Sequence, residues 1–331
     1  MRPLPIGATD LSAFYPVFRN PHLATIAASF WPRRLDESVF PVRQWLLRTE
    51  PDVQVLIHSQ SPADPPRGEV VLVHGLEGSS RAGYMRSMAQ TMLDAGFAVH
   101  RFNIRACGGG EFLCRTLYHA GLTHDLLQLL FDLDRRRRTP VFLLGFSLGG
   151  NMVLKLAGEL GPGASRLLQA VCAVSTPVDL LASARRIGHP ENRHYEWWFL
   201  YNMKRRMRRR RALLNGSVSL QGLDRASSLY EFDDRFTAPA FRFRGAEHYY
   251  RTQSALGFLA GIQVPTLLLQ AKDDPLIPFS CFEDPALHAN PFVRLVTTER
   301  GGHLGFVSRP LPRFWVDGAA LCFFLQCLGN K

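Results

Sequence analysis

Residues 140–154 read Pro-Val-Phe-Leu-Leu-Gly-Phe-Ser-Leu-Gly-Gly-Asn-Met-Val-Leu. The first part, Val141 to Leu144, is apolar at every position, which is typical of a strand buried on both faces of a sheet. From Met152 onward, apolar residues recur at helical spacing. Ser147 lies between the two parts. The stretch therefore predicts a strand, a sharp turn that carries a serine, and a helix.

Two glycines flank this serine. Gly145 and Gly149 lack side-chain bulk, so strand and helix can approach closely while Ser147 adopts a strained backbone conformation. This is the pattern of a nucleophile elbow. The pentapeptide is short, and a glycine-rich turn with a capping serine explains it equally well. The rest of the chain has to decide between the two.

Strands and helices alternate around this stretch. Buried strands are expected at residues 69–73, 97–102, 168–174, 265–271 and 293–297, and helices at 84–93, 123–133 and 314–327. Alternation of this kind predicts an α/β fold with a mostly parallel central sheet flanked by helices. Weak alternation near 39–47 and 53–58 predicts an antiparallel hairpin at the sheet edge.

We expect three parts in the chain. Residues 1–68 would form an N-terminal arm and the edge hairpin, with 14–31 as an irregular arm broken by prolines. Residues 69–177 and 262–331 would form the α/β core. Residues 178–261 contain many aromatics and arginines and no obvious buried strand, and they predict a helical cap over the sheet.

The chain of 331 residues carries a formal charge of +11, with arginine runs at 135–138 and 204–211. Its four lysines stand against 35 arginines, which indicates a preference for arginine throughout the chain. No motif with interleaved stacking aromatics accompanies the runs, so we expect no nucleic-acid partner. A solvated basic face is favoured, and weak association with an anionic membrane surface remains the alternative.

The sequence contains no recognisable targeting segment, membrane span or zinc-binding motif. Residues 1–10 contain no apolar segment of signal-peptide length, and no stretch approaches the length of a membrane span, so a soluble cytoplasmic protein is expected. The six cysteines are scattered without CxxC spacing, which predicts reduced thiols and no zinc site. Oligomeric state is left open.

Three polar residues each follow a predicted strand: Ser147, Asp274 and His303. In an open α/β sheet, residues beyond the carboxyl ends of the strands converge on one edge. Ser147 would be the nucleophile, His303 the general base, and Asp274 would orient the imidazole. Asp273 is the competing acid, and the spacing of Asp274 to Pro278 favours Asp274.

The negative charge that develops on a substrate oxygen needs preorganised donors. The backbone N–H groups of Leu148 and Leu76 are the expected pair. His74 is interpreted as shaping the loop that carries Leu76. His119, His124 and Asp125 match no ligand spacing, and the start of a helix is their expected place, with a capping role.

Several motifs together resemble the YheT-like branch of the α/β-hydrolases: Gly145-Phe-Ser-Leu-Gly-Gly-Asn151, His74-Gly-Leu-Glu-Gly78, Asp273-Asp-Pro275, Gly301-Gly-His-Leu-Gly-Phe306, Phe18-Arg-Asn-Pro-His-Leu23, Tyr118-His-Ala-Gly121 and Tyr249-Tyr250. The resemblance implies a serine hydrolase with carboxylesterase or acylglycerol-lipase activity, the three residues above as its triad, and no metal or organic cofactor. The chain departs from the family at Arg105-Ala-Cys-Gly-Gly-Gly110, where Arg-Gly-Cys-Gly-Gly-Ser is usual.

The sequence thus predicts hydrolysis of an ester through an acyl-enzyme, with an apolar acyl or alkyl group in a small-molecule substrate. Thioester and amide substrates stay open, because the same triad serves all three. The alternative is a non-catalytic binding protein on a hydrolase fold, docked to an anionic surface through residues 204–211.

Overall fold

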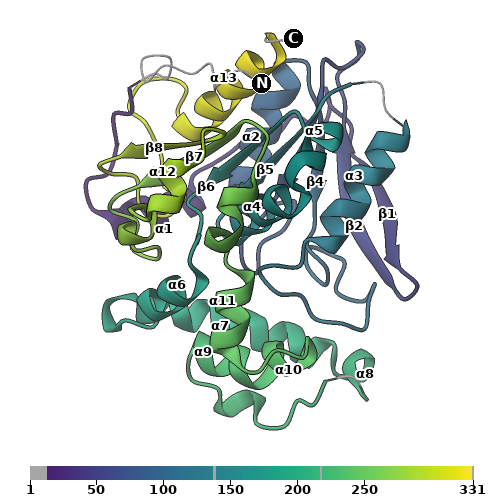
Figure 1. Cartoon of the computed structure of the whole chain (residues 1–331), viewed down its shortest axis with the longest axis vertical. Coiled ribbons are helices and arrows are strands. Elements are labelled where there is room, and N and C mark those ends of the chain that lie inside the picture. Colours follow the sequence, from purple (N-terminus) through teal and green to yellow (C-terminus); the bar gives the residue numbers. More distant parts are fainter. Residues whose placement is uncertain (1–12, 137–138, 217, 330–331) are drawn as a thin grey trace.

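The computed structural model describes residues 13–136, 139–216 and 218–329. An eight-stranded sheet in the order β1-β2-β4-β3-β5-β6-β7-β8 forms the centre of this described part (Figure 1). The strands are β1 (Arg43–Glu50), β2 (Val53–Gln60), β3 (Glu69–Val73), β4 (Ala98–Phe102), β5 (Val141–Phe146), β6 (Ala170–Val174), β7 (Thr266–Ala271) and β8 (Val293–Thr298). β2 pairs antiparallel with β1 and with β4, and the other neighbours pair in parallel. The predicted mostly parallel sheet is confirmed.

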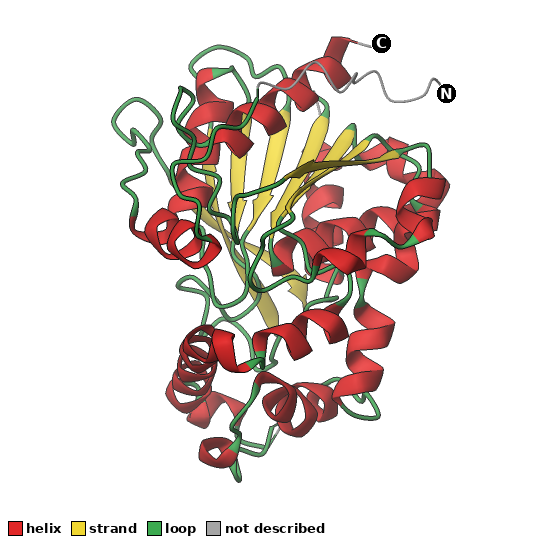
Figure 2. Ribbon diagram, turned by 90° about the vertical axis from the view of Figure 1, so that its left-hand side faces the viewer, coloured by secondary structure: helices red, strands yellow, loops and turns green. Residues whose placement is uncertain are grey.

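Helices cover both faces of the sheet (Figure 2). Successive side chains of a strand point to opposite faces, so β3 serves two layers. Val70 and Leu72 pack with α2 (Gly83–Asp94) and α13 (Trp315–Gly329). Val71 and Val73 belong to the layer of α3 (His124–Arg136), α4 (Leu148–Leu160) and α5 (Ala164–Leu167). This double burial explains the continuous apolar strands in the sequence.

The hairpin prediction is confirmed, with β1 at the edge of the sheet and the turn at Pro51 and Asp52. The prediction of an irregular arm over 14–31 is wrong, because Pro21–Phe30 forms a regular helix, α1. Asn20 caps this helix, since its side chain accepts a hydrogen bond from the Leu23 amide at 3.0 Å. Pro21 occupies the first turn, where a proline costs no hydrogen bond. The proline therefore starts a helix here.

The segment between β6 and β7 contains helices and, in its described residues, no strand. The helices are α6 (Leu180–Ile187), α7 (Arg193–Arg209), α8 (Arg211–Leu214), α9 (Leu229–Phe232), α10 (Ala238–Ala240) and α11 (Ala246–Gln253). Most of this segment lies at one end of the sheet, at the bottom of Figure 1. The chain boundaries of the cap, at residues 178 and 261, stay a prediction.

The arginine run at 204–211 does not form one solvated face, so that prediction is wrong. Arg206 and Arg210 point inward one helical turn apart, and Arg210 is fully buried. The Arg210 guanidinium donates hydrogen bonds to the carbonyl oxygens of Glu111, Cys114 and Thr116 at 2.6 to 2.8 Å. Helical periodicity divides the run between an inner and an outer face. In the other run, Arg137 and Arg138 lie outside the described residues.

Within residues 13–329 as described, no helix is long and apolar enough to cross a membrane. The first residues, on which the expectation of no signal peptide rests, lie outside this part.

Candidate active site

Ser147 occupies the sharp turn between β5 and α4, with φ at +52°. Few residues other than glycine adopt this region, and strained serines of this kind cluster at functional sites. The turn is tight: a Cβ on Gly149 would lie 2.5 Å from the carbonyl oxygens of Val73 and His74. Glycine at this position therefore lets α4 start directly against the end of β3.

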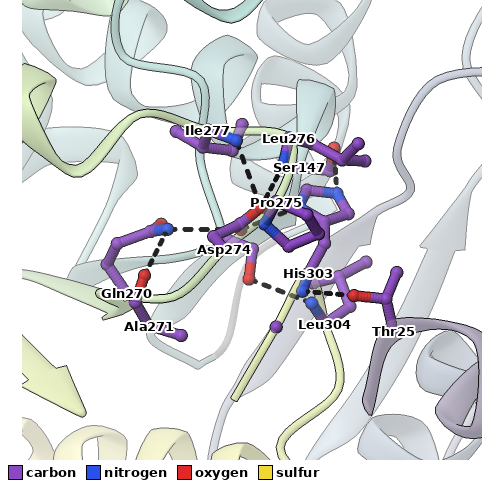
Figure 3. A network of polar contacts seen from close by, with 12 residues as sticks. Thr25, Ser147, Gln270, Ala271, Asp274, Pro275, Leu276, Ile277, His303 and Leu304 are labelled. Atoms are coloured by element: carbon purple, nitrogen blue, oxygen red, sulfur yellow. Dashed lines mark hydrogen bonds and ion pairs between the residues drawn. The ribbon is translucent and has the colours of Figure 1, made fainter. Parts of the chain in front are cut away.

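His303 bridges the serine and an acid (Figure 3). Its Nε2 lies 3.0 Å from the Ser147 hydroxyl oxygen, and its Nδ1 lies 2.9 Å from Oδ2 of Asp274. An ionised carboxylate only accepts hydrogen bonds, so Nδ1 carries the proton and Nε2 is free to accept one from the serine. The three predicted residues are brought together in this order.

The Asp274 side chain is fully buried and held by further donors. Its Oδ1 accepts hydrogen bonds from the amides of Leu276 and Ile277, at 2.9 and 3.1 Å. Asp273 points elsewhere and accepts a hydrogen bond from the Gly302 amide at 2.8 Å. Burial raises the pKa of Asp273. Asp274, not Asp273, contacts the histidine.

Two residues behind His303 were missed from the sequence. Thr25 of α1 accepts a hydrogen bond from the His303 amide at 2.9 Å and donates one to the Pro21 carbonyl at 2.7 Å. Ser175, which follows β6, accepts a hydrogen bond from the Leu304 amide at 3.1 Å. A lone threonine or serine carries no pattern, so sequence inspection had no signal to find them.

The expected oxyanion donors are the amides of Leu76, in the loop after β3, and of Leu148, at the start of α4, and both residues line a cavity together with Ser147. Neither amide donates a hydrogen bond to another residue of the described chain. His74 fixes the loop, because Nε2 accepts from the Ile104 amide at 3.1 Å and Nδ1 donates to the Gly75 carbonyl at 2.7 Å. Burial lowers the pKa of His74 to about 4, so the ring is neutral at pH 7. This neutral ring is a structural support of the loop.

The chain is similar to known proteins over most of its length. The model of the alpha/beta hydrolase family matches residues 70–315. The chain belongs to the alpha/beta hydrolase family. YheT of Escherichia coli (strain K12) is 31% identical over 306 residues, which cover 91% of this chain and 88% of YheT. The predicted resemblance to the YheT-like branch is thereby confirmed.

Two further hydrolases extend the comparison. A monoacylglycerol lipase of Saccharomyces cerevisiae (strain ATCC 204508 / S288c) is 29% identical over 280 residues, or 81% of this chain and 61% of the lipase. The solved structure of the Pyrococcus furiosus esterase Pf2001 superposes with a TM-score of 0.60 at 17% identity, covering 89% of this chain and 98% of the esterase. At that identity the match supports the shared fold alone.

Ser147 and His303 of this alpha/beta hydrolase lie between two hollows. An inner cavity extends under the helical segment, and its lining is largely apolar, with Leu117, Leu180, Ile187, Met203, Leu229 and Phe232 among its residues. An outer groove of about 390 Å³ runs between α1 and α7. Leu76, Phe199 and Leu276 line both hollows. The serine is therefore accessible from two sides.

The other polar groups singled out in the sequence have structural uses. Asp125 binds the Arg105 guanidinium through two contacts of 2.7 and 2.8 Å, so the expected capping role is wrong. His119 packs against Phe241 and Phe243, and burial lowers its pKa to about 3. Among the described residues no group of three or more histidine, cysteine or acidic side chains could hold a metal, and no disulfide joins any of the six cysteines.

The departure from the usual loop sequence has a local effect. Ala106 stands where the family has glycine, and its φ is +62°. It packs against Val53 and Cys114 and lines neither hollow at Ser147. A non-glycine residue in this conformation costs backbone strain.

Proposed function

We propose that the chain is a serine hydrolase that cleaves carboxylic esters through Ser147, His303 and Asp274. The observation that carries this proposal is the pair of hydrogen bonds on His303, 3.0 Å to the Ser147 hydroxyl and 2.9 Å to Asp274. A serine hydroxyl is a weak nucleophile at neutral pH, and a base within hydrogen-bond reach is what activates it.

The reaction then runs in two halves. Ser147 Oγ attacks the ester carbonyl carbon while His303 Nε2 takes the hydroxyl proton, and the tetrahedral intermediate collapses when Nε2 returns that proton to the leaving alcohol. Water attacks the acyl-enzyme by the same route and releases the acid. Asp274 stabilises the imidazolium that forms in each half. Every proton is balanced within the triad, so no metal or cofactor is required.

The amides of Leu76 and Leu148 would stabilise the oxyanion of both intermediates. Their lack of partners in the described chain supports this role, because a preorganised donor must be free to receive the substrate oxygen. Losing one such donor typically costs about 3 kcal/mol of the activation free energy.

The two hollows support an ester with apolar groups on both sides of the carbonyl. The largely apolar inner cavity would receive the acyl chain, and the outer groove would receive the alcohol. A small-molecule ester suits the yeast relative, whose name is monoacylglycerol lipase. A panel of nitrophenyl esters of graded acyl length, with thioester and anilide analogues, tests this assignment. Equal rates for all chain lengths would contradict an acyl-binding cavity.

Labelling by a fluorophosphonate probe tests the mechanism itself. We expect stoichiometric labelling that disappears in Ser147→Ala, with both proteins equally folded by circular dichroism. Well-folded protein that shows no Ser147-dependent labelling would leave the non-catalytic binding protein as the better explanation. A cytoplasmic location also stays a prediction, which fractionation of cells that express the full chain tests.

A further inference from the structure

One face of α7 lines two hollows, the largely apolar outer groove and a second hollow that is basic. Trp198, Asn202, Arg205 and Arg209 follow each other at spacings of four, three and four residues, so they share a face over roughly 16 Å. Trp198 lines the outer groove that leads to Ser147. Asn202, Arg205 and Arg209 line a separate polar pocket of about 320 Å³.

This basic pocket lies between α7, the loop after β3 and the glycine-rich loop after β4. Its charged residues are Arg81, Arg205, Arg206, Arg209, Glu77 and Glu111, so cations exceed anions. Glu77 is already bound by Arg206 at 2.8 Å. No residue of the described chain forms an ion pair with Arg205 or Arg209, and both are exposed. Gly78 lines the pocket and the groove alike, so the two hollows adjoin.

Large apolar side chains are exposed on α1 and α7, and three of them, Ile26, Phe30 and Trp198, line the groove. On α1 these are Leu23, Ile26 and Phe30, of which Phe30 is 82% exposed. On α7 they are Trp197, Trp198 and Tyr201, and Trp197 stacks on Tyr201 with ring centroids 5.6 Å apart. We call these six residues the apolar rim. Tyr195 hydrogen-bonds to His22 at 3.3 Å and so connects the two helices behind the rim.

We propose that the apolar rim and the basic pocket form a docking face for an anionic lipid surface. Exposed tryptophan and tyrosine beside arginine is the composition of helices that lie in a membrane interface. The rim would enter the acyl boundary while Arg205 and Arg209 bind the headgroups. A second copy of the chain suits this face poorly, because each copy carries a net charge of +11.

Docking in this orientation has a consequence for catalysis, which rests on the proposed function. The groove is lined both by rim residues, Ile26, Phe30 and Trp198, and by Ser147 and His303. An ester with long apolar groups would pass from the lipid layer to the serine without crossing water. Exposed α1 and α7 would be its entrance.

Vesicle flotation tests the docking, with the full chain carrying Ser147→Ala so that turnover plays no part. We expect binding to phosphatidylcholine vesicles that contain phosphatidylglycerol, little binding to phosphatidylcholine alone, and weakening by salt. Arg205→Gln with Arg209→Gln should lower the partition coefficient about 30-fold, which is about fivefold for each arginine near an anionic surface. The matched control is Arg43→Gln with Arg48→Gln on β1, two exposed arginines that line neither the basic pocket nor the groove, and it should change the partition coefficient less than about twofold.

Phe30→Ser with Trp197→Ser should lower the partition coefficient about tenfold, because exposed apolar area no longer enters the bilayer. Leu46→Ser on β1 is its control. If the Arg43 and Arg48 pair lowered the partition coefficient as much as the Arg205 and Arg209 pair, general charge attraction would explain the binding and the proposal would be overturned. Rim variants that abolish a dimer in sedimentation velocity yet bind vesicles normally would make the rim a subunit interface. All flotation experiments use Ser147→Ala, so a failure to bind vesicles would say nothing against the proposed ester hydrolysis. Conversely, a failure of fluorophosphonate labelling would not affect the flotation test of docking.

Discussion

Arg206 of α7 forms an ion pair with Glu77, the residue that follows Leu76. Its Nη2 lies 2.8 Å from Oε1 of Glu77, and its Nε lies 3.0 and 3.2 Å from the two carboxylate oxygens. Both side chains are at least nine-tenths buried. Tyr118 donates a further hydrogen bond to Oε1 at 2.9 Å, and Glu77 itself holds φ at +53°. A buried ion pair thus connects α7 to the loop that presents the Leu76 amide.

Breaking this pair should affect both stability and rate. Arg206→Gln or Glu77→Gln leaves one buried charge uncompensated, and we expect each to lower the free energy of unfolding by about 3 kcal/mol. Displacement of Leu76 should lower kcat about 100-fold with little change in KM. The double variant should recover much of the stability but not the rate. Urea unfolding and ester kinetics measure both effects, and additive losses in the double variant would refute the coupling.

Replacing Asp274 should separate it from its neighbour. Asp274→Asn keeps the shape of the side chain but removes the charge that orients His303, and we expect kcat to fall about ten-thousandfold. Asp273→Asn is the matched control, because its Oδ1 can still accept from Gly302, and it should change kcat only a few-fold. Steady-state kinetics on a short-chain ester decide the matter. Comparable losses in the two variants would count against Asp274 as the orienting acid.

Thr25 should act as a positioning residue. Thr25→Val leaves the His303 amide without an acceptor, so we expect a loss of about 1 to 3 kcal/mol in stability and about a tenfold lower kcat. Thr25→Ser keeps the hydroxyl and should restore the rate. If Val and Ser behave alike in the kinetics, the hydroxyl has no part in holding the histidine.

The turn at Ser147 should tolerate no side chain on Gly149. A Cβ there would lie 2.5 Å from two carbonyl oxygens, and backbone cannot move aside cheaply, so Gly149→Ala should unfold the protein or cost several kcal/mol. A Cβ on Gly163 would have no neighbouring atom within 4 Å, and the φ of Gly163 is negative. Gly163→Ala should therefore be neutral or stabilise the protein by about 0.5 kcal/mol. Thermal melts compare them, and an unchanged melt for Gly149→Ala would contradict the packing described.

Asp317 should give a measurable pH dependence. It is 2% exposed, and burial raises its pKa from 3.8 to about 6, although Arg33 opposes the shift. The folded protein thus binds the proton more tightly, so stability from this group is present at low pH and is lost as pH rises from about 4 to 6. Asp317→Asn lacks this loss, so the stability of the variant relative to wild type should rise by about 2 kcal/mol between pH 4 and pH values above 6.5. A difference between wild type and variant that is constant across urea titrations from pH 4 to 7.5 would contradict this.

The core of the fold could be predicted because its strands are buried on both faces. Continuous apolar runs such as Val141–Phe146 are hard to mistake, and parallel strands bring their carboxyl ends to one edge. The positions of Ser147, Asp274 and His303 after three such strands therefore predict that they lie together at this edge. Their roles in catalysis still rest on the proposal above.

The supporting residues could not be predicted, since each depends on contacts between distant segments. Arg206 and Glu77 are separated by 129 positions and lie in unrelated patterns. The arginine run reads as one exposed stretch in sequence, yet Arg206 and Arg210 point inward because they lie one turn apart. The helix α1 was missed because Pro21 looks like a helix breaker until Asn20 is seen to cap it.

The contact between Thr25 and His303 spans 278 positions of the chain. During synthesis α1 leaves the ribosome long before the loop that carries His303. The Thr25 hydroxyl therefore lacks its hydrogen-bond donor, the His303 amide, while all eight strands are being synthesised. The His303 amide gains this acceptor only when α1 packs against that loop. On the proposed mechanism, ester hydrolysis therefore requires that synthesis has passed His303. A nascent chain that ends before this residue should not hydrolyse esters.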